Sequence, residues 1–142
     1  MEYEIRVLTA SDEAVLQNVA PEVLDRGTDW QLTREFLADQ RHHMVVAIDE
    51  AGMVIGFASG VHYVHPDKPA QMFINEVGVA PSHQGQGIGR AVVQRIVQLA
   101  SDLGCKEAWV LTDRENAAAM RMYERAGGRR EKAQEMFIFS LR

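Results

Sequence analysis

The sequence predicts an α/β fold in which helices flank a mixed β-sheet. Three observations support this prediction. Segments of alternating or continuous apolar residues, typical of strands, recur along the chain. Segments with apolar residues at helical spacing lie between them, and in the second half strands and helices alternate, as crossover connections require. The 142 residues contain no repeat or Pro/Gly-rich linker, so a single domain is expected over residues 1–142.

A strand and two helices are expected before residue 42. Tyr3–Leu8 alternates as a short strand. Thr9–Ser11 offers N-cap chemistry for a helix that begins near Asp12. Trp30–Gln40 carries apolar residues at helical spacing, which predicts a second, amphipathic helix.

Three consecutive strands are predicted next. Met44–Ile48 and Met53–Val64 are strand-like and are separated by turn residues around "DEAG", which favours an antiparallel hairpin. After a proline-containing loop, Gln71–Ala80 forms a third long strand that ends at Pro81.

The second half alternates helix and strand. The first of these helices runs to about Leu103 and has a buried stripe of residues four apart: Ile88, Val92, Ile96 and Ala100. Glu107–Thr112 predicts a further strand. A helix capped by Asn116 is expected to run to about Ala126, and Met136–Leu141 predicts a last strand.

Charge and composition exclude several classes of function. The net charge of −5 argues against a nucleic-acid partner and fits a small cationic one. No apolar run approaches the roughly 20 residues that cross a bilayer, and no signal peptide is visible, so no membrane partner and a cytoplasmic location are expected. The single cysteine, Cys105, predicts a buried structural thiol. The five histidines follow no metal-binding spacing, so no metal is expected.

The stretch "SHQGQGIGRAVV" at residues 82–93 places three glycines between a predicted strand and a predicted helix. The first N–H groups of a helix lack partners and face an anion readily, and glycine lets the backbone approach it closely. A Walker-type loop is excluded because the loop continues as Gly-Arg-Ala rather than Gly-Lys-Ser/Thr. Arg90 stands where the dinucleotide fingerprint needs its third glycine.

Two segments resemble the signatures of the GCN5-related N-acetyltransferase (GNAT) family. "QGQGIG" at residues 84–89 matches the family's Q/R-x-x-G-x-G/A pattern, and "LTDRENAAAMRMYERAGG" resembles its second signature. The resemblance implies the family fold, with a mixed, mostly antiparallel central sheet of six to seven strands flanked by about four helices. It also implies direct transfer of acetyl from acetyl-CoA to a primary amine.

The resemblance also implies where acetyl-CoA binds. The pyrophosphate would lie on backbone N–H groups of the turn: Gln84, Gly85, Gln86, Gly87, Ile88, Gly89 and Arg90. Pantetheine would pair with the fourth strand at Val77 and Val79, and the Val77 N–H would polarise the thioester carbonyl. Asn116 would contact the pantetheine arm. Tyr123 would be the general acid for the departing thiolate, unless its ring only packs on the core.

The reaction also needs a base, because most amines are protonated at neutral pH and only the neutral form attacks. Glu76 is the best candidate, since alternation directs its side chain to the face opposite Val77, the residue that would supply the oxyanion donor. Asp113, at the end of the next strand, is the second choice. A partly exposed or salt-bridged Glu76 and a helix-capping or turn-forming Asp113 are the structural alternatives.

The acceptor is predicted from a narrower resemblance. Residues 51–82 look most like the aminoglycoside 3-N-acetyltransferase branch, which would make the protein an antibiotic-resistance enzyme. Aminoglycosides are polycations whose sites need several carboxylates. The candidate substrate-binding acids are Glu22, Asp25, Asp29, Glu76, Asp113 and Glu135.

Other functions stay open at this point. The same chemistry would acetylate a peptide N-terminus, a lysine or a polyamine. A non-catalytic acyl-CoA-binding sensor is the alternative from another class, although such a protein needs neither Glu76 nor Tyr123. Dimers are common in the family, so a homodimer is also open, but the sequence carries no interface signature.

Overall fold

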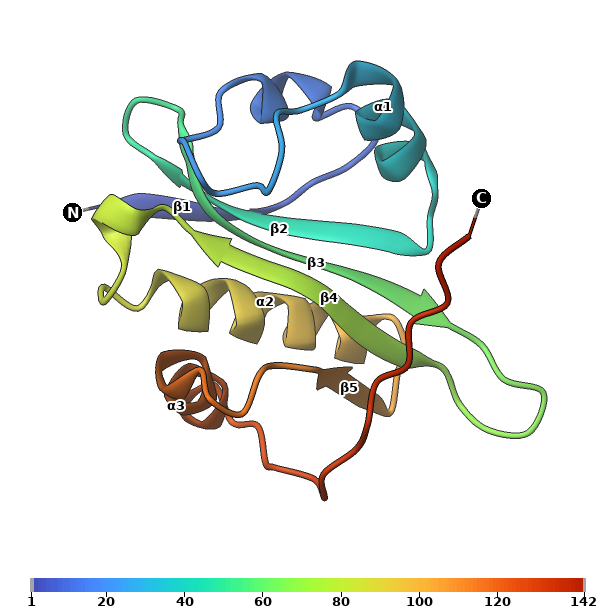
Figure 1. The fold of residues 1–142 in the computed structure, drawn as a ribbon. Helices are drawn as coiled ribbons and strands as arrows, with labels where there is room; N and C mark the ends of the chain where they lie inside the picture. The colour runs from blue at the N-terminus through green and yellow to red at the C-terminus, as the bar shows by residue number, and fades with distance from the viewer. Residues whose placement is uncertain (1, 142) are drawn as a thin grey trace.

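The computed structural model describes residues 2–141. Its strands form one five-stranded sheet in which spatial order follows chain order (Figure 1). The strands are β1 (Tyr3–Val7), β2 (His42–Asp49), β3 (Val54–Tyr63), β4 (Gln71–Val79) and β5 (Glu107–Val110). The first four pair antiparallel, and only β4 and β5 are parallel. The predicted β2–β3 hairpin and the crossover in the second half are therefore confirmed.

Helices cover both faces of the sheet. The α-helices are α1 (Trp30–Ala38), α2 (Ile88–Asp102) and α3 (Ala117–Arg125), and the short 3₁₀ helices are η1 (Glu13–Gln17) and η2 (Pro81–His83). Figure 1 shows η1 and α1 on one face and α2 on the other, with α3 beside α2. Helix α2 carries the crossover from β4 to β5, as parallel neighbours require.

The buried stripe predicted for α2 is confirmed. Ile88, Val92, Ile96 and Ala100 are each at most 3% exposed. Full burial of one such aliphatic side chain contributes about 1.5–3 kcal/mol. The stripe therefore holds α2 firmly against the sheet, and the N-terminus of α2 is fixed beside the end of β4.

The predicted numbers of strands and helices are wrong, since residues 2–141 contain five strands and three α-helices rather than six to seven and about four. The helix expected near Asp12 is only the five-residue η1. The Asp12 carboxylate does not cap it, because Oδ2 instead accepts from the backbone N–H of Thr9 at 2.7 Å and from its hydroxyl at 2.9 Å. These bonds tighten a turn before η1 rather than starting a helix.

The last predicted strand, Met136–Leu141, is also absent from the sheet. Its five large apolar side chains are 74–91% exposed. A strand needs a partner's backbone groups as well as an apolar pattern, and no segment of residues 2–141 supplies them to these residues.

Candidate active site

The parallel pairing of β4 with β5 ends part-way along β4. The last paired residues are Ile74 and Val110, whereas β4 continues to Val79. The backbone N–H of Ala80 donates to Ile55 of β3 at 2.8 Å. Because successive amides of a strand point in opposite directions, the N–H groups of Val79 and Val77 face away from β3, into the opening beyond β5. The open edge of β4 therefore offers main-chain donors to an extended ligand.

A cavity of about 330 Å³ occupies this opening. Its walls come from Asn75–Val77 of β4, from residues 110–112 at the end of β5, and from α3. Among the residues predicted from the sequence, the cavity brings together Asp25, Glu76, Val77, Asn116 and Tyr123. Four separate segments of the chain thus contribute to one site.

Two of these residues come from α3, seven positions apart, so they lie on the same face of the helix. Asn116 is the N-cap, as predicted, and its Oδ1 accepts from the backbone N–H of Ala119 at 3.0 Å. Its Nδ2 is then the group left to donate toward the cavity. Tyr123 is half-buried, and this burial raises the pKa of its phenol. At neutral pH the phenol therefore keeps its proton.

A β-bulge determines where Glu76 points. Ser59 of β3 pairs with Glu76 but the next residue, Gly60, pairs with Ile74, so Asn75 is the extra residue. Met72 and Ile74 are buried on the face of the sheet that α2 covers. The position of Gly60 identifies this face, because a Cβ there would meet both Met72 and a side chain of α2. Without the bulge Glu76 would share that buried face. With it, the carboxylate lies on the opposite, exposed face.

A close contact brings the loop after η1 to the same place. A Cβ at Gly78 would lie 2.6 Å from the carbonyl oxygen of Val23, so only glycine permits this approach. Val23 is 4% exposed and anchors the loop of residues 21–28. As a result Asp25, two residues further on, lines the cavity that also contains Glu76.

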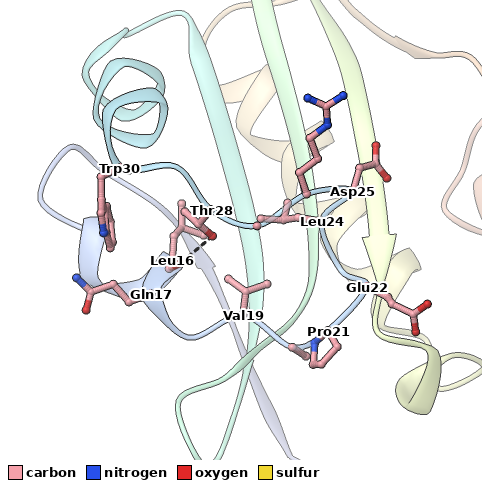
Figure 2. A pocket seen from close by; sticks show the side chains of 12 residues that line it. Leu16, Gln17, Val19, Pro21, Glu22, Leu24, Asp25, Thr28 and Trp30 are labelled. Atoms are coloured by element: carbon pink, nitrogen blue, oxygen red, sulfur yellow. Dashed lines mark hydrogen bonds between the residues drawn. The ribbon is translucent and has the colours of Figure 1, made fainter.

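A second, larger cavity of about 610 Å³ lies between η1 and this loop. The hydroxyl of Thr28 donates to the carbonyl oxygen of Leu16 at 3.2 Å and holds the loop to η1. Figure 2 shows the carboxylates of Glu22 and Asp25 on the β4 side of the loop, and Trp30 on the far side. Asp25 lines both cavities, so it marks where they meet.

The Gly-rich turn forms the other end of the site. Gly85 and Gly87 have φ of +79° and +84°, and Gly87 is the N-cap of α2 without any side-chain cap. The first helical bond runs from the N–H of Ala91 to the carbonyl of Gly87 at 3.0 Å. Within residues 2–141, the N–H groups of residues 88–90 therefore have no protein acceptor. This is the arrangement that binds an anion at a helix start.

The turn is also tied to the open edge of β4. The side chain of Gln84 donates from Nε2 to the carbonyl oxygen of Val79 at 3.3 Å. A Cβ at Gly89 would lie 3.6 Å from Val79 and 3.7 Å from Met122 of α3. The free amides at the start of α2 thus adjoin both the β4 edge and the α3 wall.

The remaining predicted acids lie elsewhere. Glu22 lines only the larger cavity. Asp29 caps α1, accepting from the backbone N–H of Leu32 at 2.9 Å. Asp113 forms a turn by accepting from the N–H of Glu115 at 3.0 Å. Glu135 is exposed in the segment after α3. The substrate-binding roles of these four residues, and a catalytic role of Asp113, stay predictions.

Three aromatic residues near the site were not predicted as a group. Tyr63, Phe73 and Trp109 come from β3, β4 and β5, on the face that also carries Glu76. The Trp109 Nε1 donates to the Tyr63 hydroxyl at 2.6 Å, and the rings of Phe73 and Trp109 are 4.5 Å apart. Trp109 is 37% exposed, which leaves part of its ring available for contact. The strand register that assembles this aromatic group is not visible in the sequence.

Three expectations concern the rest of the chain. Cys105 is buried and its pKa is raised by that burial, which confirms the structural thiol. Among residues 2–141, no group of three histidine, cysteine, aspartate or glutamate side chains could hold a metal ion. No helix in that range is long and apolar enough to span a membrane.

The model of the acetyltransferase (GNAT) family matches residues 11–128. The chain belongs to this family. The GNAT chain is 37% identical over 84 residues to a mycothiol acetyltransferase of Pseudarthrobacter chlorophenolicus, a match that covers 58% of the chain and 26% of that protein. It is 33% identical over 90 residues to a streptothricin acetyltransferase of Streptomyces lavendulae, which covers 63% and 45%. This GNAT chain thus spans less than half the length of both relatives.

Among solved structures, the GNAT chain resembles an aminoglycoside acetyltransferase from an uncultured soil metagenomic sample, crystallised with sisomicin. The TM-score is 0.81 with 18% sequence identity, and the match covers 99% of this chain and 97% of the other. At this identity the likeness supports the GNAT fold.

Proposed function

We propose that this protein is an N-acetyltransferase that moves acetyl directly from acetyl-CoA to a primary amine. The observation that carries the proposal is the open edge of β4, which adjoins unpaired amides at the start of α2 at one end and Glu76 at the other. One extended ligand with an anionic end and a reactive end fits this arrangement.

Acetyl-CoA is the donor that suits these groups. Its pyrophosphate would accept hydrogen bonds from the amides of residues 88–90 and benefit from the positive end of the α2 dipole. Its pantetheine arm would pair with the free amides of Val77 and Val79 as an added strand does. The Nδ2 of Asn116 would donate to the same arm.

The chain supplies a group for each proton and charge in the transfer. Glu76 accepts a proton from the substrate ammonium, and the neutral amine attacks the thioester carbonyl carbon. The Val77 N–H stabilises the oxyanion of the tetrahedral intermediate. The C–S bond then breaks, and Tyr123, kept protonated by its raised pKa, gives its proton to the thiolate.

For the acceptor we propose an aminoglycoside amine, with the 3-amine as the first candidate position. Asp25 and Glu76 line one cavity and would pair with ammonium groups of a polycation. The exposed part of Trp109 would contact a sugar face or an ammonium group. The fold shared with the sisomicin complex and the match to a streptothricin acetyltransferase also favour a cationic antibiotic.

A second candidate follows from the sequence relatives. The 37% identity to a mycothiol acetyltransferase favours the acceptor of those enzymes instead. Peptide N-termini, lysines and polyamines would use the same catalytic groups.

A free-thiol release assay with acetyl-CoA tests these proposals together. The acceptors are an aminoglycoside panel, streptothricin, the mycothiol acetyltransferase acceptor, polyamines and short peptides. Turnover on aminoglycosides, with the acetylated nitrogen assigned by NMR, supports the main proposal. Turnover confined to another group replaces the proposed acceptor. Acetyl-CoA binding without release of thiol on any amine would favour the acyl-CoA-binding sensor.

A further inference from the structure

The β-bulge in β4 places two consecutive side chains on one face of the sheet. Ile74 is buried on the face that α2 covers, so alternation directs the next side chain, Asn75, to the opposite, exposed face. Glu76 lies on that exposed face as well, because the bulge interrupts the alternation. A regular strand cannot produce this arrangement, since its successive side chains point to opposite faces. The bulge thus sets a carboxamide directly beside the proposed base.

The Asn75 carboxamide is available to a ligand. Asn75 is exposed and lines the same cavity as Glu76 and Asp25. Its side chain makes no hydrogen bond to a group of residues 2–141, whereas the Asn116 carboxamide in the same cavity is used to cap α3. A carboxamide donates through Nδ2 and accepts through Oδ1. Asn75 therefore adds a neutral polar group to a cavity that also contains two carboxylates.

The spacing of the two side chains determines what they can bind together. Consecutive Cα atoms are about 3.8 Å apart, whereas same-face residues of a regular strand are two positions, or roughly 6.6 Å, apart. A molecule that contacts both Asn75 and Glu76 must therefore carry two polar atoms close to each other. In the proposed reaction Glu76 takes the proton of the amine. The group that meets Asn75 then lies on the carbon next to the one that bears the amine.

The charge of the cavity determines which kind of group this is. The carboxylates of Glu76 and Asp25 repel an anionic substituent. A second ammonium group would bind these carboxylates more strongly than a neutral carboxamide. A neutral oxygen remains, and it accepts from Nδ2 of Asn75. A hydroxyl oxygen would in addition donate to Oδ1.

We propose that Asn75 is a specificity-determining residue that binds an oxygen atom on the carbon next to the acceptor amine. This inference rests on the proposed acetyl transfer and narrows its acceptor to 2-oxygenated amines. Amino sugars and α-amino carbonyl compounds carry that oxygen, whereas lysine side chains and polyamines do not. Two contacts, at Glu76 and at Asn75, fix the direction of the amine lone pair toward the thioester carbon.

Ethanolamine and propylamine are a matched pair of acceptors for the test, because they differ only in a hydroxyl or a methyl at the position in question. The measured quantity is the ratio of their kcat/KM values in the thiol-release assay. Where the wild type acetylates only larger acceptors, the ratio of the two inhibition constants against such an acceptor takes its place. Comparison of this ratio between variants cancels the difference in basicity of the two amines.

Asn75→Ala should lower the preference for ethanolamine over propylamine by about three- to tenfold, the usual effect of losing one neutral hydrogen bond. The value for propylamine should stay close to that of the wild type. Asn18→Ala is the matched control, because Asn18 is exposed and lies outside the cavity. It should keep the wild-type ratio.

The possible failures are distinguishable. An unchanged ratio in an active Asn75→Ala variant overturns the role of Asn75 and leaves the proposed acetyl transfer in place. An equal loss with both amines, together with a lower urea midpoint, would mean that Asn75 only supports the bulge, and this also overturns the inference. Absence of thiol release with every amine of the panel overturns the proposed function itself, and the inference with it.

Discussion

Gly78 of β4 lies against Val23 so closely that a Cβ would stand 2.6 Å from the Val23 carbonyl oxygen and 2.9 Å from the Phe57 ring. This contact joins the strand that carries Glu76 to the loop that carries Asp25. The placement of Glu76 and Asp25 in one cavity thus depends on Gly78, a residue with no side chain.

Gly78→Ala should push the loop away from β4, because a backbone carbonyl cannot move aside as a flexible side chain can. We expect the free energy of unfolding to fall by about 1–3 kcal/mol. The KM for the amine should rise, while the affinity for acetyl-CoA stays the same. Urea unfolding and steady-state kinetics measure both effects. Gly27→Ala is the control in the same loop, since a Cβ there meets nothing within 4 Å.

Gly87→Ala and Gly104→Ala form a matched pair at the two ends of α2. Their φ values are +84° and +86°, and a Cβ meets nothing within 4 Å at either position. Both variants should lose stability by about 1–2 kcal/mol from left-handed strain. Only Gly87→Ala should weaken acetyl-CoA binding, by at least about threefold in calorimetry, because only Gly87 opens the helix end proposed to bind pyrophosphate. Equal affinities in the two variants would remove that role from the turn.

Glu76→Gln should lower kcat by at least roughly tenfold, the usual effect of removing a general base. The affinity for acetyl-CoA should change less than about twofold, since the proposed donor contacts are backbone amides. Glu50→Gln, in the exposed turn between β2 and β3, is the control and should have wild-type kinetics. If Glu76→Gln retains full turnover, the base lies elsewhere and Asp113→Asn is the next variant.

Tyr123→Phe should lower kcat by about a hundredfold. Burial raises the pKa of Tyr123 above its ordinary value of 10, so the phenol is protonated through neutral pH. Activity that needs this proton is present below the raised pKa and is lost as pH rises through it. The variant should lack this alkaline decline in the pH profile of kcat, whereas Tyr3→Phe in β1 should keep it. An unchanged alkaline decline in Tyr123→Phe would assign it to another group.

His43 should make the protein less stable in acid. Burial and then the neighbouring charge of His62 lower the pKa of His43 from 6.5 to about 4, and the two rings are 2.7 Å apart between Nε2 and Nδ1. The His43 imidazole therefore binds a proton more readily in the unfolded chain than in the folded one. The stability that the neutral imidazole contributes is fully present above pH 6.5 and is lost as the pH falls toward 4.

The urea midpoint should accordingly decrease between pH 6.5 and pH 4. In His43→Gln the decrease should be smaller, while His83→Gln, in the turn before α2, should behave as the wild type. A wild-type midpoint that stays constant over this range would contradict the lowered pKa.

Local patterns in the sequence predicted most of the fold. The α2 stripe, the Asn116 cap and the β2–β3 hairpin depend on residues close in the chain, and all three are confirmed. Met136–Leu141 was predicted wrongly as a strand of the sheet, because an apolar pattern shows that a segment suits a strand but not which edge will pair with it.

The site was harder to predict than the fold. The spacing of Asn116 and Tyr123 puts both residues on one helix face, and the sequence contains that information. The only sign of the bulge at Asn75 in the sequence is a pair of adjacent polar residues, Asn75 and Glu76, in an apolar strand, and such a pair does not specify a bulge. The left-handed backbone of Glu22, with φ of +66°, has no signal in the sequence, since glutamate rarely adopts this conformation.

The two halves of the site use different parts of the polypeptide. At the start of α2 the proposed binding groups are amides, which every residue type except proline carries, so substitutions outside the left-handed glycines of this turn leave the donors in place. At the opposite end the proposed groups are side chains on a surface loop and on strand faces, where a single substitution replaces the functional group itself. On the proposed function, substitutions in residues 21–28 and around Trp109 would change the acceptor while the donor stays the same.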